Sequence, residues 1–68
     1  MFYAMRENDE GFYVSIHEED GLQAIDTSPV CSTIEAADVE FHKAIGFRLE
    51  WQAPDEDADR DVRLIGRG

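Results

Sequence analysis

The chain has 68 residues and carries 6 Lys and Arg against 16 Asp and Glu, for a net charge of −10. Such a short chain makes one domain, residues 1–68, of marginal stability, because much of its surface stays exposed. The charge excludes direct nucleic-acid binding, and no apolar run approaches the length of a membrane span. The single cysteine, Cys31, cannot form an internal disulfide, which favours a reducing, cytoplasmic location.

The first part of the chain predicts a meander of short strands. Residues 2–6, 12–17 and 22–25 are rich in apolar and aromatic side chains, and turn residues at 7–11 and 18–21 separate them. In the second strand the apolar residues share one face, and a tyrosine lies with the polar ones on the other: Phe12, Val14 and Ile16 against Tyr13, Ser15 and His17. We therefore expect two successive hairpins, the third strand ending at residues 26–29.

A helix follows in the middle of the chain. Ser32 is the expected N-cap, and Glu35 would complete a capping box with it. Gly46 is placed for a left-handed C-cap, and Lys43 adds a favourable cation in the last turn. Apolar residues recur at three- and four-residue steps and form one stripe: Ile34, Ala37, Phe41 and Ala44 or Ile45.

The last part of the chain alternates again and then becomes acidic. Residues 47–52 predict a strand with one buried face, which Pro54 ends. Residues 53–61 form an acidic loop, 62–65 a short closing strand, and 66–68 an end that should fray. The fold class is α+β: a small antiparallel sheet of three to five strands with one helix packed across it.

The acidic residues are the main functional signal. Carboxylates on a folded surface can stand in for nucleic-acid phosphates and attract proteins with basic grooves. Salt adaptation or a GC-rich genome would also produce few lysines and many acids, so solvation is the competing interpretation. The candidate partner-binding residues are eight acids and one aromatic: Glu7, Asp9, Glu10, Glu18, Glu19, Asp20, Glu35, Asp38 and Tyr13.

Other sequence patterns give weaker indications of a metal or catalytic site. Aspartates alternate from Asp55 to Asp61 as in a calcium loop, but Arg60 replaces the turn glycine, so a solvated loop is expected. His17 and His42 have no partner at a zinc-ligand spacing, and Cys31 has no obvious base nearby. No phosphate loop or nucleophile motif is present. We expect no catalytic residue, metal or cofactor, and hence no enzyme.

Two resemblances bear on function. The run from Glu10 to Ser15, Glu-Gly-Phe-Tyr-Val-Ser, followed by Ser32 to Ala37, Ser-Thr-Ile-Glu-Ala-Ala, resembles the strand-then-helix signature of HicB-type antitoxins. That resemblance implies a small strand-rich domain that neutralises a basic toxin. As a lone, small, strongly acidic α+β domain, the chain also resembles, in type only, phage-encoded anti-CRISPR proteins and other DNA mimics.

The leading hypothesis is therefore a non-enzymatic inhibitor, an anti-CRISPR-like viral protein by type, that acts in the cytoplasm, which is the host's if the protein is phage-encoded. It would bind the basic nucleic-acid-binding surface of a bacterial defence complex or nuclease by DNA mimicry, with no membrane contact. The alternatives are a HicB-like antitoxin domain, or a salt-adapted acidic domain whose role is open. An unpaired edge strand in so small a sheet also allows a homodimer.

Overall fold

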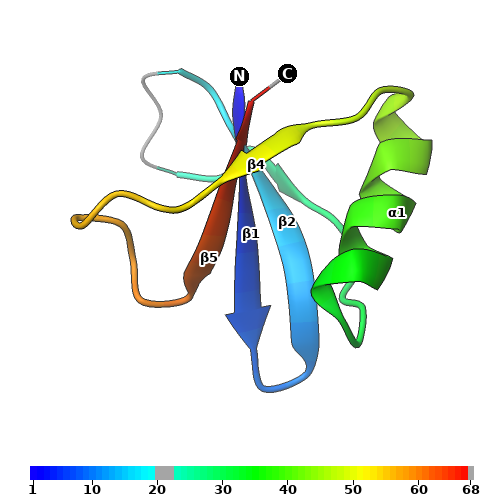
Figure 1. Ribbon diagram of the computed structural model, residues 1–68, viewed down its shortest axis with the longest axis horizontal. Helices are drawn as coiled ribbons and strands as arrows, with labels where there is room; N and C mark the ends of the chain where they lie inside the picture. The colour runs from blue at the N-terminus through cyan, green and yellow to red at the C-terminus, as the bar shows by residue number, and fades with distance from the viewer. Residues whose placement is uncertain (20–22, 68) are drawn as a thin grey trace.

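An antiparallel sheet with one helix on one of its faces forms the fold (Figure 1). The computed structural model describes residues 1–19 and 23–67. Over these residues the five strands lie in the order β3-β2-β1-β5-β4, every pair antiparallel. The predicted α+β class is confirmed. The elements are β1 (Phe2–Asn8), β2 (Gly11–His17), β3 (Asp26–Thr27), α1 (Ile34–Ile45), β4 (Glu50–Gln52) and β5 (Val62–Arg67).

The predicted hairpin between β1 and β2 is present, but its turn is shorter than residues 7–11, because β1 continues to Asn8 and β2 begins at Gly11. Asn8 pairs with Gly11, and the Asn8 Oδ1 accepts hydrogen bonds from the backbone N–H groups of Glu10 and Gly11 at 2.8 and 3.1 Å. Gly11 has a φ of 143°, a conformation that favours glycine. A Cβ at this position would collide with the carbonyl oxygen of Cys31, so glycine is required here for two reasons.

The third strand lies later in the chain than predicted. Strand β3 is Asp26–Thr27, which pairs with Ile16 and Ser15 of β2, whereas residues 23–25 are not in a strand. Residues 20–22, which include the end of the predicted turn 18–21 and the start of the predicted strand, lie outside the described residues. The register follows from backbone pairing: the N–H of Ser28 donates to the carbonyl of Val14 at 2.8 Å. Apolar content alone does not determine where such a long connection rejoins the sheet.

The helix has the predicted apolar stripe but a different N-cap. Thr33 is the N-cap, because its Oγ1 accepts a hydrogen bond from the N–H of Ala36 at 3.0 Å. The predicted capping box between Ser32 and Glu35 is therefore wrong by one residue. The C-cap is Gly46 as predicted, with a φ of 84° and its N–H donating to the carbonyl of His42.

The C-terminal strands also differ from the prediction. Strand β4 contains only Glu50–Gln52, and Phe47 is 44% exposed instead of belonging to the strand. Strand β5 extends to Arg67 and lies inside the sheet between β1 and β4. The expectation of a frayed end is wrong for Gly66 and Arg67, because both pair with residues of β1 and β4. Gly68, the third residue of the predicted frayed end, lies outside the described residues.

The hydrophobic core lies between α1 and one face of the sheet. Tyr3 and Phe41 meet edge to face, with ring centroids 5.3 Å apart. Burial of large side chains of this kind stabilises the fold by about 1.5 to 3 kcal/mol each. The other buried residues of this core come from β1, β2, α1 and the segment before β4. They are Met5, Val14, Ala37 and Leu49.

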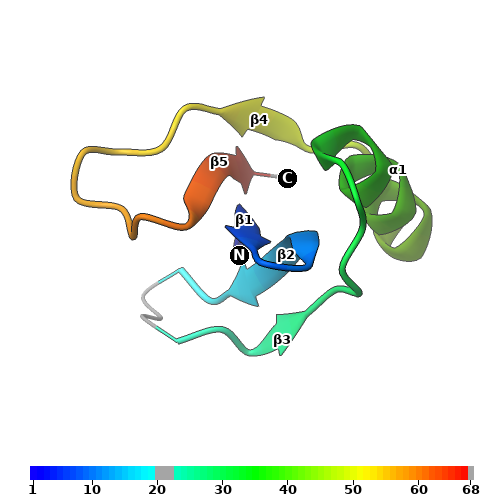
Figure 2. The same ribbon diagram turned by 90° about the horizontal axis from the view of Figure 1, so that it is seen from below.

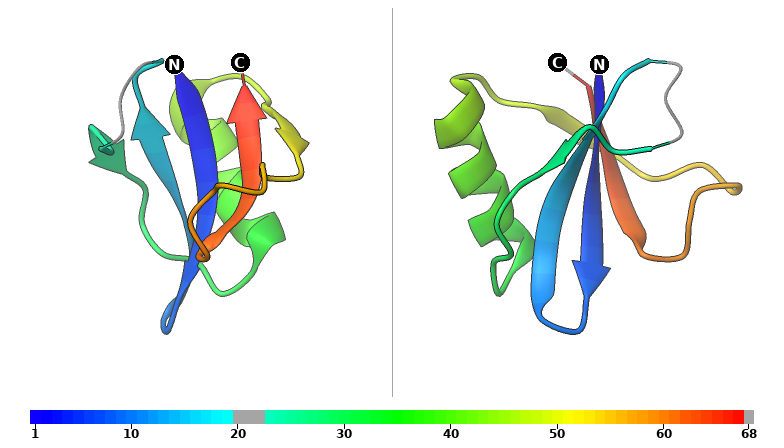
Figure 3. Two further views of the ribbon diagram at one scale, coloured as in Figure 1. Left: turned by 90° about the vertical axis from the view of Figure 1, so that its left-hand side faces the viewer. Right: turned by 180° about the vertical axis from the view of Figure 1, so that it is seen from behind.

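The opposite face of the sheet is covered differently. The acidic loop, residues 53–61, follows β4 and lies on the side of the sheet away from α1 (Figures 2 and 3). The sheet is therefore sandwiched between a helix and a loop, and both of its faces are partly covered. Among the described residues no helix is both long and apolar enough to cross a membrane.

Candidate functional site

A chain of polar side chains crosses the loop-covered face of the sheet. The Nε of Arg6 on β1 donates to the Oγ of Ser15 on β2 at 2.9 Å, and this Oγ lies 2.8 Å from the Nε2 of His17. Ser15 and His17 are buried, and the ring of Phe2 stacks on that of His17 with centroids 4.8 Å apart. The alternation in β2 places Ser15 and His17 on one face, but only the pairing of β1 with β2 brings Arg6 to them.

Arg6 also connects the sheet to the acidic loop. Its Nη1 donates to both carboxylate oxygens of Asp61 at 2.9 Å and lies 3.5 Å from the Oδ2 of Asp59. Burial by itself would lower the pKa of Arg6, but the hydrogen bond and negative charge of Asp61 outweigh it, so the pKa is raised. The guanidinium is thus a permanent cation that is neutralised within the protein.

His17 is the second ionisable group of this face. Burial, and next the positive charge of Arg6, lower its pKa, while the carbonyl of Gln23 and the carboxylate of Asp59 act in the opposite direction. His17 is consequently neutral at pH 7. Its Nδ1 is buried and makes no hydrogen bond of good geometry within residues 1–19 and 23–67, and the carbonyl of Gln23 is the backbone group that acts on the ring.

A cavity of about 220 Å³ lies between this face and the loop. Arg6 and His17 both line it, and so do apolar side chains of the sheet and residues of the loop. The two carboxylates on its loop side, those of Asp57 and Asp59, are exposed to solvent. The other lining residues are Phe2, Ala4, Val62 and Ile65 from the strands and Ala58 from the loop.

The contact between Ser15 and His17 has the distance of a nucleophile and its base. Ser15, however, is only 1% exposed, and its Oγ already accepts a hydrogen bond from Arg6. A substrate cannot reach a hydroxyl that is covered in this way. The hydrogen bond from Arg6 to Ser15 therefore connects β1 to β2, and the contact between Ser15 and His17 orients the imidazole ring.

A second cavity, of about 190 Å³, lies beside the helix. Cys31 and Phe41 line it, together with Ser28, Pro29, Glu40 and Ala44. Cys31 is half-buried, and its backbone forms an isolated bridge with Phe12. The site offers a thiol and one carboxylate but no buried polar group with an unmet hydrogen bond.

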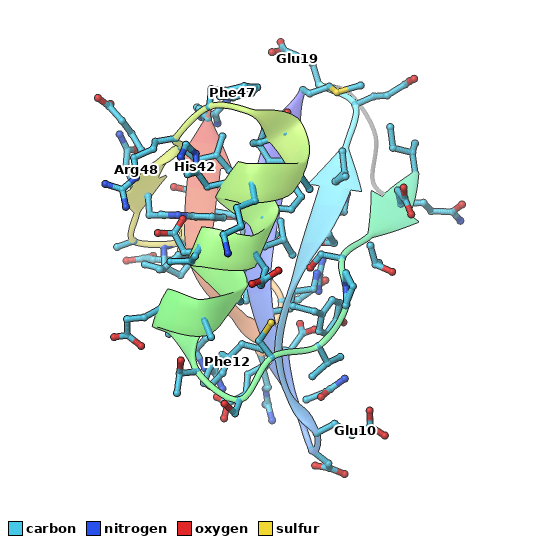
Figure 4. The ribbon with its side chains drawn as sticks, turned by 90° about the vertical axis from the view of Figure 1, so that its right-hand side faces the viewer. Glu10, Phe12, Glu19, His42, Phe47 and Arg48 are labelled. Carbon is cyan, nitrogen blue, oxygen red and sulfur yellow. The ribbon has the colours of Figure 1, made fainter. Side chains whose placement is uncertain are left out.

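The candidate partner-binding acids are spread around the molecule. Glu10 and Glu19 lie at opposite ends (Figure 4), as the sequence predicts for successive hairpin turns. Asp20 lies outside the described residues. The carboxylates that are exposed to solvent are those of Asp9, Glu10, Glu18, Glu19 and Glu35.

Three of the candidate residues are half-buried, and two of them make side-chain hydrogen bonds to other parts of the chain. The Oε1 of Glu7 accepts a hydrogen bond from the Nε of Arg63 at 3.0 Å. The Oδ1 of Asp38 accepts one from the Nε1 of Trp51 at 2.9 Å, which ties α1 to β4. Tyr13 is half-buried. These contacts give Glu7 and Asp38 structural roles that the sequence pattern did not indicate.

No cluster of three or more His, Cys, Asp or Glu with the arrangement of a metal site occurs among the described residues. In the acidic loop, Asp59 and Asp61 are directed to Arg6 rather than to a common centre. Sequence reasoning did not identify Arg6, Ser15 and His17 as a unit, because its only signal was the alternation in β2. No protein-family model, curated protein or solved structure matches this chain.

Proposed function

We propose that the protein is a non-enzymatic inhibitor that occupies the basic nucleic-acid-binding surface of another protein, in a bacterial defence complex or a nuclease. The observation that supports this function best is the exposure of acidic side chains at both ends of a compact sheet. Asp9 and Glu10 lie at the tip of one hairpin, and Glu18 and Glu19 follow the other end of β2. Glu35 adds an exposed carboxylate in the first turn of α1.

The amount of charge is comparable to that of a nucleic acid of the same size. The molecule measures 27 Å along its longest axis and carries a net charge of −10. Duplex DNA has one phosphate charge per 1.7 Å, so a 27 Å segment carries about 16. The protein therefore presents a large fraction of that charge density to a basic groove.

The protein's own cations leave most of these carboxylates available, although Glu19 lies 3.5 Å from the N-terminal ammonium. Arg6 is bound to Asp61, Arg63 to Glu7, and Lys43 lies 3.6 Å from Glu40. Among the described residues neither Asp9 nor Glu10 forms an ion pair. Unpaired charges of this kind accelerate association with a basic protein, and the effect weakens as salt increases.

A competition assay tests this function. A fluorescent duplex is bound to each member of a panel of purified RNA-guided nucleases and DNA nucleases, and its anisotropy is measured as the protein is added. We expect release of the duplex from at least one member, with weaker competition at about 300 mM salt than at about 50 mM. An unlabelled duplex serves as the reference competitor.

Paired charge removals locate the contact. The variants Asp9→Asn with Glu10→Gln, and Glu18→Gln with Glu19→Gln, should compete less well, mainly through slower association. The variant Asp26→Asn with Glu50→Gln is the matched control, because it removes the same charge from exposed residues of the edge strands. If all three double variants compete equally poorly, the inhibition depends on total charge and not on a defined surface. If the protein releases the duplex from no nuclease in the panel, the proposed function is contradicted. A small basic partner that binds equally well at both salt concentrations would instead favour the antitoxin-like alternative.

A further inference from the structure

We propose that protonation of His17 is a switch that breaks the side-chain connection between β2 and the acidic loop. On β2, His17 contacts Ser15, and the Oγ of Ser15 accepts a hydrogen bond from Arg6. Arg6 in turn donates to Asp61 at the end of the loop. The switch is a property of the isolated protein and does not depend on the proposed function.

The direction of these hydrogen bonds follows from the hydrogens that each atom carries. The Nε of Arg6 can only donate, so the Oγ of Ser15 accepts from it at 2.9 Å. Ser15 is 1% exposed, and within residues 1–19 and 23–67 the other side-chain partner of its Oγ is the Nε2 of His17 at 2.8 Å. The hydroxyl hydrogen therefore points to Nε2, which has no hydrogen of its own. Neutral His17 carries its hydrogen on Nδ1.

The backbone near His17 supports this assignment. The carbonyl of Gln23 acts on the ring in the direction that raises its pKa. A carbonyl only accepts hydrogen bonds, so it stabilises a ring nitrogen that carries a hydrogen. Because Nε2 faces Ser15, the nitrogen on which Gln23 acts is Nδ1.

Protonation of the ring reverses one of these hydrogen bonds. The added proton binds Nε2, so His17 becomes a donor where it was an acceptor. Two cationic N–H groups, those of Arg6 and His17, then face one oxygen, and the hydroxyl hydrogen of Ser15 has lost its acceptor. Arg6 is the group that leaves, because its Nη1 stays bound to Asp61 through two hydrogen bonds of 2.9 Å. Strand β2 is thereby released from the loop.

The environment of His17 sets the pH at which the switch operates. Burial, and next the positive charge of Arg6, lower the pKa of His17 from 6.5, while Asp59 acts in the opposite direction. The ring is therefore neutral at pH 7 and gains its proton in mildly acidic solution. Histidines in such settings act as pH sensors in other proteins.

Arg6 is the one charged group among the described residues that shares a hydrogen-bonding oxygen with His17. It is therefore the group that protonation displaces. The other groups on the packed elements are the N-terminal ammonium, which lies 3.5 Å from Glu19, Asp57, which lines the cavity with His17, the uncharged Thr27, which pairs with Ser15, and Arg67, which pairs with Phe2.

NMR of the ¹⁵N-labelled protein tests the switch. At about pH 7.5 the ring signals of His17 should report a hydrogen on Nδ1 and none on Nε2. As the pH falls to about 5, the Nε–H of Arg6 should lose protection from solvent exchange about two- to tenfold, the range for loss of one hydrogen bond, after correction for intrinsic exchange. The backbone amides of Ala58 and Asp59 should shift with the same midpoint as the His17 ring.

Two variants and a control isolate the contact. In Ser15→Ala the shared oxygen is absent, so His17 should still titrate but the Arg6 and loop signals should no longer follow it. In His17→Gln the side-chain carbonyl can accept from Ser15 without titrating, so the Nε–H of Arg6 should stay protected throughout. His42→Gln removes the other histidine and should behave like the unmodified protein.

The switch is refuted if neutral His17 carries its hydrogen on Nε2, if the ring stays neutral down to about pH 5, or if it gains a proton while Arg6 stays protected. Equal shifts of the loop amides in His17→Gln would also refute it, because they would then report carboxylates. Simultaneous loss of all native signals would show global unfolding in place of a local switch. The ring hydrogen and the titration of the unmodified protein need no variant, so they decide the question if Ser15→Ala does not fold.

Discussion

The guanidinium of Arg6 on β1 donates two hydrogen bonds of 2.9 Å to the carboxylate of Asp61, at the end of the acidic loop. Through its Nε the same side chain binds Ser15 on β2. A single residue therefore connects two central strands to the loop that covers them. The backbone supports the connection, because the N–H of Glu7 donates to the carbonyl of Asp61 at 2.9 Å.

The Arg6–Asp61 contact should contribute measurably to stability. We expect a double-mutant cycle with Arg6→Met and Asp61→Asn to give a coupling energy of about 1 to 2 kcal/mol, because both groups are partly removed from solvent. Urea unfolding of the four proteins measures it. If the two substitutions change the free energy of unfolding additively, the coupling energy is zero and the contact does not stabilise the fold.

The stability of the protein should depend on pH through His17. The pKa of His17 is lowered from the ordinary value of 6.5, so the unfolded chain binds a proton more readily than the folded one. The folded state favours the neutral ring of His17. This stabilisation is therefore fully present above pH 6.5, and it is lost as the pH falls through the lower pKa of the folded state and the ring becomes protonated. We expect the free energy of unfolding to decrease below this pH, by at most about 1.4 kcal/mol per pH unit.

Variants at the two histidines assign this dependence. His17→Gln should flatten the change in stability between about pH 7.5 and 5.5, where most carboxylates stay ionised. His42→Gln should leave it in place. Urea unfolding at several pH values is the measurement, and a slope that survives in His17→Gln would assign it to another group.

The two glycines with positive φ should tolerate alanine to different extents. Gly46 has open space around its Cβ position, so Gly46→Ala should cost about 1 kcal/mol, the ordinary strain of a left-handed residue. At Gly11 a Cβ also collides with the Cys31 carbonyl, so Gly11→Ala should cost about 2 to 4 kcal/mol. Thermal or urea unfolding compares them, and equal costs would exclude the collision as a determinant.

Gly66 should be required for the position of Trp51. A Cβ on Gly66 would lie 2.8 Å from the Cζ3 of Trp51, so Gly66→Ala should destabilise the protein by about 1 to 3 kcal/mol. Trp51 is the only tryptophan in the chain, and its fluorescence emission should shift when the ring moves. In a Trp51→Leu background the cost of Gly66→Ala should be smaller, and an unchanged cost would contradict the contact.

The N-cap can be located by a pair of neighbouring substitutions. Thr33→Ala removes the acceptor for the N–H of Ala36 and should cost about 1 kcal/mol. Ser32→Ala alters an exposed residue outside the cap and should change stability by no more than about 0.5 kcal/mol. Urea unfolding distinguishes the two, and the reverse order would restore Ser32 as the cap.

Local patterns were sufficient to predict several elements. The alternation along β2 placed Val14 on the core face, and the helical spacing placed Ala37 and Phe41 there as well. Gly46 ended the helix as predicted, since a C-cap depends on a few adjacent residues. The acidic character of residues 53–61 and the position of hairpin turns at opposite ends of the sheet were also readable from the sequence.

The remaining features depend on contacts between distant parts of the chain. Either Ser32 or Thr33 could cap the helix by residue type, and β3 and β5 took positions that only strand pairing determines. For the same reason, alternation placed Ser15 and His17 opposite the core, but only the pairing of β1 with β2 brings Arg6 onto Ser15 and Phe2 onto His17. The sequence by itself determined the periodicity of the elements and the charge of the surface. The tertiary structure decided which charge is neutralised inside, because Arg6 meets Asp61 only when β5 pairs with β1.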